Sequence, residues 1–250
     1  MELTVAVVLV GSLATFVFGL SKTAIPAVGS FGAALLTLVL PALPSTGVAL
    51  PVLLVGDLIA LSFYARHVEV KVLVRMLPAV LVGVVTGFLV VDHVDRHVAA
   101  RIIGVLLIVS GLGEIARRRR AAAHGGQPPA AGHSDVGSLA LGAGAGFSTM
   151  VANAGGPMMT LYLLRLGVTT TTFLGTVAWF FFALNLLKVP FSIGLGLITP
   201  QSLVISAALV PGIVIGALVG RRLVLGMSRA LFENLALIAT TAAGVWLLVV

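Results

Sequence analysis

The sequence predicts an all-α integral membrane protein. We expect a polytopic helical bundle built from two inverted repeats of about five segments each, with interrupted half-helices and about eight to ten membrane segments in all. Composition, the spacing of apolar runs and a likeness between the two halves lead to this fold class. Of the 250 residues, 59% are hydrophobic and 9% are charged, whereas a soluble domain carries roughly 25% charged residues. Such a chain cannot cover a water-facing surface, which excludes a soluble enzyme, a disordered chain and a nucleic-acid-binding domain.

Ten apolar segments follow one another along the chain. A membrane-spanning helix needs about 20 mostly apolar residues, so a chain of this length holds at most about ten. The segments cover approximately 3–20, 25–40, 46–64, 72–91, 98–116, 136–152, 156–166, 172–191, 202–223 and 230–250. No basic stretch precedes the first segment, and no small-residue cleavage site follows it. We therefore expect it to be a retained helix and not a signal peptide.

One polar stretch, residues 117–135, divides the chain almost in half. It contains four consecutive arginines followed by Gly-Gly and Pro-Pro pairs, a composition typical of a flexible linker. The predicted organisation is a first membrane repeat at 1–116, a linker at 117–135 and a second membrane repeat at 136–250.

The two halves resemble each other at two fixed offsets, and the same residue types recur in the same order. The matched positions are Gly19/Gly146, Ser21/Ser148, Ala27/Ala154 and Gly29/Gly156 at an offset of 127, and Pro78/Pro211, Gly83/Gly216, Gly87/Gly220, Arg96/Arg229 and Gly111/Gly244 at an offset of 133. Spaced Pro, Gly and Arg matches favour an internal repeat over chance agreement in a Gly-rich sequence. An odd number of segments in each repeat inverts the second repeat relative to the first.

The basic residues agree with this inversion. If the loops alternate sides starting from outside, one side receives twelve of the fifteen Lys and Arg residues. These are Lys22, Arg66, Lys71, Arg75, Arg117, Arg118, Arg119, Arg120, Arg165, Arg221, Arg222 and Arg229. The positive-inside rule then predicts that the linker lies in the cytoplasm and that both termini lie outside. The net charge of +7 is read as this topology signal and not as a binding surface for polyanions.

The second and seventh segments are interrupted. The apolar runs 31–40 and 158–166 are about 15 Å long as helices, too short for a hydrocarbon core of about 30 Å. We expect each run to be a half-helix that starts inside the membrane after an unwound stretch, holding Ser21, Lys22 and Thr23 in one half and Ser148, Thr149 and Asn153 in the other.

Two half-helix N-termini that meet near the midplane would form an anion site, because each presents unpaired N–H groups and a partial positive charge. The alternative is that the glycines only permit close helix packing. The predicted substrate-binding residues are Ser21, Thr23, Gly29, Ser30, Ser148, Thr149, Asn153, Gly155 and Gly156.

These features together resemble the TauE/SafE sulfite exporter-like permeases over nearly the whole chain. The likeness rests on the Gly-rich breaks at 19–30 and 146–157, the Pro-rich turn at 41–44, the aromatic-basic loop at 63–68 and a helix with Pro and Gly-x-x-x-Gly in each half. The family typically has three consecutive glycines, whereas the breaks here read Ala-Val-Gly-Ser and Ala-Gly-Gly-Pro. The resemblance implies transport of small sulfur-containing or organic anions, such as sulfite or sulfonates, across the cytoplasmic membrane.

Four polar residues are expected to belong to coupling or to the transport pathway: Lys22, Asp57, Asn185 and Lys188. Asp57 lies well inside the third segment, where a carboxylate is costly. Proton coupling, structural pairing with a lysine and interfacial placement are three alternatives for it. Asn185 is its counterpart at an offset of 128, and Lys188 follows one turn later. The expected position of Lys22, at the cytoplasmic end of its segment, favours a role in substrate access or topology.

The function expected from these features is secondary transport of a small anion by alternating access, with protons as the expected coupling ion. Transport of a cation or neutral solute, or an intramembrane enzyme, is the alternative. We expect no catalytic residues, no metal site and no cofactor, because no Ser-His-Asp set or phosphate loop is present and the chain has no cysteine. The expected partners are the anion, protons and the lipid bilayer of the cytoplasmic membrane, with no nucleic acid. Oligomeric state and direction of transport stay open.

Overall fold

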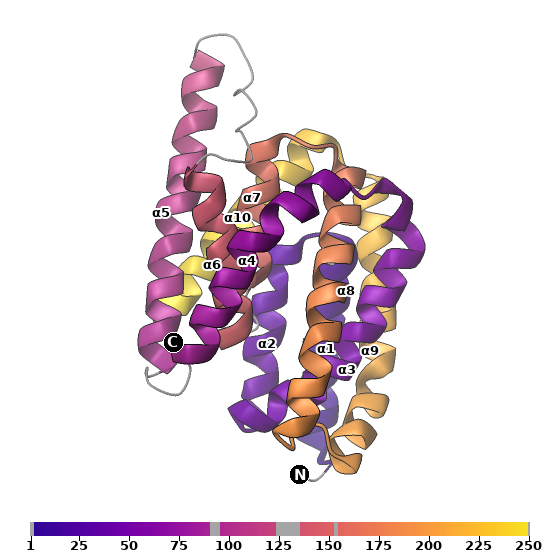
Figure 1. Ribbon diagram of the computed structural model, residues 1–250. Helices are drawn as coiled ribbons and strands as arrows, with labels where there is room; N and C mark the ends of the chain where they lie inside the picture. Colours follow the sequence, from indigo (N-terminus) through magenta and orange to yellow (C-terminus); the bar gives the residue numbers. More distant parts are fainter. Residues whose placement is uncertain (1–2, 91–95, 124–135, 153–154, 250) are drawn as a thin grey trace. The chain divides into compact units, whose positions relative to one another are not determined.

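The computed structural model describes residues 3–90, 96–123, 136–152 and 155–249 (Figure 1). These ranges contain ten α-helices, two short 3₁₀ helices and no strand. Six of the helices are long and apolar enough to cross a membrane: α1, α3 with the residues just after it, α4, α8, α9 and α10. The all-α, multi-pass prediction is confirmed. The helices form two compact units, residues 1–69 with 171–227 and residues 70–170 with 228–250.

The first unit combines helices from both halves of the sequence. Its elements are α1 (Val5–Thr23), η1 (Pro26–Val28), α2 (Gly29–Thr37), α3 (Ala42–Tyr64), η2 (Ala65–His67), α8 (Thr170–Gly194) and α9 (Pro200–Leu225). Thr4 caps α1 by accepting from the Val7 N–H, and Thr199 forms a capping box with Ser202 at the start of α9. The core of this unit comprises apolar side chains from α1, α2, α3 and α9, with Phe18, Leu36, Val52 and Leu209 among them.

Helices α1 and α9 pack closely because glycines lie at their contact. A Cβ atom on Gly19 would collide with the backbone of Ile213, and one on Gly216 would collide with the backbone of Phe16. The Thr15 hydroxyl donates across the same contact to the Leu209 carbonyl at 3.0 Å. Small residues and hydroxyl hydrogen bonds of this kind hold helices together in membranes, where apolar burial alone drives no association.

The second unit contains the remaining helices: α4 (Val70–Val90), α5 (Arg96–Ala123), α6 (Val136–Ala152), α7 (Gly155–Leu166) and α10 (Arg229–Val249). Helices α4 and α6 pack in the same manner as α1 and α9. A Cβ atom on Gly146 would collide with the Val80 backbone, and one on Gly83 would collide with the Ala143 backbone. Helix α5 meets α10 at Gly104 and Gly244, whose backbones approach each other.

The contacts of α1 with α9 are repeated by those of α6 with α4. An offset of 127 carries α1 onto α6, and an offset of 133 carries α4 onto α9. The contact of Gly19 with Ile213 corresponds to that of Gly146 with Val80. The contact of Phe16 with Gly216 corresponds to that of Ala143 with Gly83. Each unit therefore holds a helix of one half packed on a helix of the other, and this agreement supports the internal repeat. The inversion of the second repeat stays a prediction.

The compact units do not coincide with the halves predicted at 1–116 and 136–250. The chain passes between units after residues 69, 170 and 227 because the α1–α9 and α6–α4 pairs each join the two halves. The predicted linker also starts too early. Residues 117–123 continue α5, where arginine and alanine are good helix formers, and residues 124–135 lie outside the described residues.

Candidate functional site

The break in the first half lies between α1 and α2, and it starts just after the three residues that were expected to be unwound. Ser21, Lys22 and Thr23 form the last turn of α1 and not an unwound stretch. The chain leaves the helix at Ala24 and runs extended through Ile25 before η1. The reason is local. Pro26 disfavours helical geometry at the residue before it, whereas a Ser or Thr hydroxyl fits a helix by bonding to a carbonyl of the preceding turn.

The hydroxyls near this break donate to backbone carbonyls. Ser21 Oγ donates to the Phe18 carbonyl at 2.7 Å, and Ser30 Oγ donates to the Ala27 carbonyl at 2.9 Å. Thr23 Oγ1 donates to the Ala217 carbonyl of α9 at 2.8 Å. A hydroxyl has one proton, so each would have to rotate before it could donate to an anion. Gly29, the first residue of α2, faces the Ser21 hydroxyl, which would lie 3.0 Å from an added Cβ atom.

A buried charged cluster lies directly beside this break, inside the first unit. Lys22 Nζ lies 2.6 Å from Asp57 Oδ1, with 7% of the lysine side chain and none of the aspartate side chain exposed. Asn185 Nδ2 donates to Asp57 Oδ2 at 2.7 Å. The ammonium also lies 4.9 Å from the centre of the Phe181 ring, a cation–π distance. Three helices, α1, α3 and α8, thus converge on one carboxylate.

Lys22 lies in the last turn of α1, at the end of its segment as expected, but it is buried and paired with Asp57. Its placement on the cytoplasmic side stays a prediction. Helix α1 continues through Thr23, so Lys22 in its last turn reaches Asp57, which lies about two turns before the end of α3. Of the three alternatives for Asp57, its pairing with a lysine is present in the structure. Its role in proton coupling stays a prediction.

Lys188 adds a second ammonium near this cluster. It lies one turn after Asn185 on α8, and it interacts electrostatically with both Asp57 and Lys22. Two lysines and one aspartate give the cluster a net charge of +1 when all three groups are ionised. This surplus of positive charge attracts an anion.

The second break lies between α6, which ends at Ala152, and α7, which starts at Gly155. Ser148 and Thr149 belong to the last turns of α6, and Asn153 lies outside the described residues. Ser148 Oγ donates to the Gly144 carbonyl at 2.7 Å. The Thr149 hydroxyl lies against Gly155, 2.7 Å from where a Cβ atom would be. Gly155 and Gly156 are both buried. Ser148 and Thr149, which were expected in an unwound stretch, are instead helical. Anion binding at this break stays a prediction.

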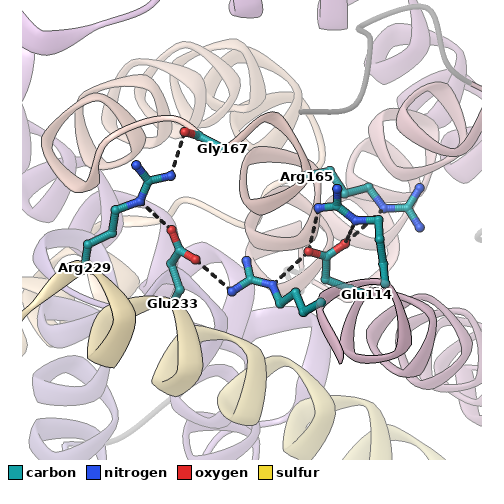
Figure 2. A network of polar contacts seen from close by, with 7 residues as sticks. Glu114, Arg165, Gly167, Arg229 and Glu233 are labelled. Atoms are coloured by element: carbon teal, nitrogen blue, oxygen red, sulfur yellow. Dashed lines mark hydrogen bonds and ion pairs between the residues drawn. The ribbon is translucent and has the colours of Figure 1, made fainter. Parts of the chain in front are cut away.

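An arginine–glutamate network occupies the second unit near the ends of α5 and α7 (Figure 2). Glu114 of α5 is fully buried and accepts hydrogen bonds from Arg117 and Arg118 of the same helix at 2.8–2.9 Å. Arg165 of α7 lies 3.9 Å from the other side of this carboxylate. From its place near the end of a segment we expect Glu114 to be solvated or paired, and in the structure it is paired. The run of four arginines that starts three residues later was the available signal for the network.

The network continues to α10 through Glu233. This carboxylate pairs with Arg118 of α5 at 2.7 Å and with Arg229 of its own helix at 2.7 Å. Arg229 also donates to the Gly167 carbonyl just after α7 at 2.7 Å, as Figure 2 shows. The network therefore ties the end of the short helix α7 to α5 and α10.

Comparison with known proteins gives one match. A family model described as "Sulfite exporter TauE/SafE" matches residues 3–247. Neither a curated protein nor a solved structure gives a significant match.

Proposed function

Because the chain belongs to the sulfite exporter TauE/SafE family, we propose that it is a secondary transporter that moves a small anion, such as sulfite or a sulfonate, by alternating access coupled to protons. The family is one of membrane transporters, and the six long apolar helices agree with a multi-pass membrane protein. The proposed location is the cytoplasmic membrane with both termini outside.

The buried cluster of Lys22, Asp57 and Asn185 carries the proposal. Ionised side chains inside a membrane protein are costly, and they mark ion pathways and proton relays more often than structural contacts. This cluster lies next to the break between α1 and α2, where the backbone can change conformation without disrupting a continuous helix. It contains the only carboxylate of α1, α2, α3, α8 and α9, so any carboxylate-based proton transfer within these helices must use Asp57.

The charges of Lys22 and Asp57 also distinguish an anion from a cation or a neutral solute as the substrate. A cation that approached Asp57 would meet the Lys22 ammonium 2.6 Å from the same carboxylate, and the two like charges would repel each other. A neutral solute needs no lysine. The surplus positive charge of the cluster favours an anion, which agrees with the family.

Flux into proteoliposomes that contain the purified chain tests this function. We expect uptake of sulfite and methanesulfonate, with no uptake of sodium or alanine. An imposed pH gradient should drive methanesulfonate uptake by the wild type. Asp57→Asn should lose this response to the gradient, because the amide keeps the shape of the carboxylate and cannot take up a proton. Failure of every anion to cross would contradict the proposed transport, and an unchanged response to the gradient in Asp57→Asn would contradict coupling at this residue.

A further inference from the structure

The Lys22 ammonium has an internal partner that any anionic substrate must replace. Asp57 Oδ1 lies 2.6 Å from Lys22 Nζ, and both side chains are buried. In a low-dielectric site, an ammonium paired with a carboxylate attracts a second anion weakly, because the pair is nearly neutral from outside. The state of Asp57 therefore controls the affinity of Lys22 for an anion.

We infer that Lys22 is the anion-binding group, that a proton on Asp57 releases it, and that anion and proton consequently bind together and cross the membrane in the same direction. This inference rests on the proposed function and deepens it. A proton from the aqueous phase adds to Asp57 Oδ1, and the anion takes the place of the carboxylate beside Lys22. On the other side the anion leaves, Asp57 returns its proton to water and the Lys22–Asp57 pair forms again. No electrons are transferred.

The charge balance of the cluster supports simultaneous binding. With Asp57 ionised, Lys22, Lys188 and Asp57 carry a net charge of +1. Protonation alone raises the net charge to +2, and a bound monoanion returns it to +1. Keeping the buried charge constant avoids the cost of an uncompensated ion in a low-dielectric region. Binding of either ligand therefore lowers the cost of binding the other, and this coupling is reciprocal.

Asn185 is suited to both protonation states of Asp57. It donates its amide N–H to Oδ2 at 2.7 Å, which leaves Oδ1 to face the lysine. With the proton on Oδ1, Oδ2 remains an acceptor, so Asn185 can keep donating to it in both protonation states. Because the repeat position equivalent to Asp57 is Asn185, the second half supplies no second carboxylate here. The expected stoichiometry is one proton for each anion.

The other charged groups around α3 are cations. Among the elements that pack on α3, α1 contributes Lys22, α8 contributes Lys188, and α2 has no titratable side chain. Helix α9 contributes Arg221 and Arg222. Arg221 lies 4.0 Å from the centre of the ring of Phe63, a residue almost two turns after Asp57 on α3. The 3₁₀ helix after α3 contains Arg66 and His67 at the same end. Asp57 is the one acidic group on these elements. Glu69 follows the 3₁₀ helix and donates its backbone N–H to Thr176 of α8, and the Tyr64 hydroxyl at the end of α3 donates to the Thr23 carbonyl.

Calorimetry on the full chain in lipid nanodiscs tests the inference, with methanesulfonate as the probe because it stays a monoanion across the working pH range. Titrations in two buffers with different ionisation enthalpies count the protons taken up. We expect uptake of about one proton per anion when Asp57 starts ionised, and a Kd that rises tenfold for each pH unit in that range. Release of a proton, or no exchange at any pH, would overturn the inference.

Substitutions distinguish the role of Asp57 from that of Lys22. Asp57→Asn should bind methanesulfonate with a pH-independent Kd near the tightest wild-type value and without proton uptake. Lys22→Gln combined with Asp57→Asn removes both charges of the pair and should lose binding at least tenfold at every pH. Lys71→Gln, at an exposed lysine of α4, is the control and should behave as wild type. Undiminished binding in the double variant would overturn the role of Lys22.

The flux experiment distinguishes failure of this inference from failure of the proposed function. Methanesulfonate uptake without accompanying proton uptake would leave anion transport intact and contradict only the coupled binding. Absence of uptake for every anion would contradict the function itself.

Discussion

Removing the Lys22 charge alone should destabilise the protein more than removing both charges of its ion pair. At 2.6 Å and an effective dielectric constant of about 20, two unit charges attract each other by about 6 kcal/mol. Most of this energy compensates for taking both groups out of water, so the pair adds little net stability. Losing one partner is different, because the other then stays buried without compensation.

The expected loss in the free energy of unfolding depends on the contacts that remain to the charge left without its partner. In Lys22→Gln, Asp57 retains only the hydrogen bond from Asn185, and we expect a loss of about 3–5 kcal/mol in the free energy of unfolding. In Asp57→Asn, Lys22 retains the Phe181 ring, a contact of about 1–2 kcal/mol, so the loss should be smaller. The double variant has no buried charge from this pair and should lie within about 1 kcal/mol of wild type.

A double-mutant cycle measures this difference. The four proteins are unfolded by SDS in mixed micelles, and the midpoint and slope give the free energy of unfolding of each. We expect a coupling energy of about 3 kcal/mol between the two side chains, at the upper end for residues in contact. Lys71→Gln serves as the control for loss of a lysine at an exposed position. Losses that add within about 0.5 kcal/mol would refute the buried pair.

Three other predictions address the remaining features. If the start of α7 also contributes to anion binding, Gly156→Val should weaken binding by placing a branched side chain where backbone N–H groups would approach the ligand. Gly113→Val, in open space on α5, is the control, and equal affinity in both would reject this contribution. Glu114→Gln should lower the free energy of unfolding by about 1–3 kcal/mol, because a buried carboxylate that accepts three arginine hydrogen bonds becomes a neutral amide. An unchanged midpoint of unfolding in SDS would show that the network does not stabilise the protein. Single cysteines test topology on this cysteine-free chain: an impermeant maleimide added to intact cells should label Leu3→Cys and not Ala123→Cys, and the reverse pattern would contradict the inverted arrangement.

The helical class and the number of segments could be predicted from sequence because the bilayer constrains them locally. A stretch of apolar residues must form a helix in lipid to satisfy its own backbone, and the short runs before 40 and before 166 can be counted without any tertiary information. The repeat could also be seen, since glycines at helix contacts recur where the same packing recurs. Gly19 and Gly146 are such a pair, and both lie at close helix contacts.

The boundary of the first break was less predictable. Ser21, Lys22 and Thr23 were expected in an unwound stretch because small polar residues often break membrane helices. The Ser21 and Thr23 hydroxyls instead donate to carbonyls of the preceding turn and of α9, which is compatible with a helical α1. Whether a hydroxyl supports or ends a helix depends on what lies opposite it, and the local sequence does not contain that information.

The sequence by itself determined that this chain is a multi-pass membrane protein, and it predicted that Asp57 and Asn185 occupy corresponding positions, because hydrophobicity and repeat spacing are properties of the linear chain. Only the tertiary structure decided that Lys22 and Asp57 form a pair and that Asn185 donates to the same carboxylate. It likewise decided that Glu114 joins α5 to arginines that include Arg165 of α7. Each of these contacts joins residues of different helices, and which helix faces come together is set by the packing of the whole chain and not by any local pattern.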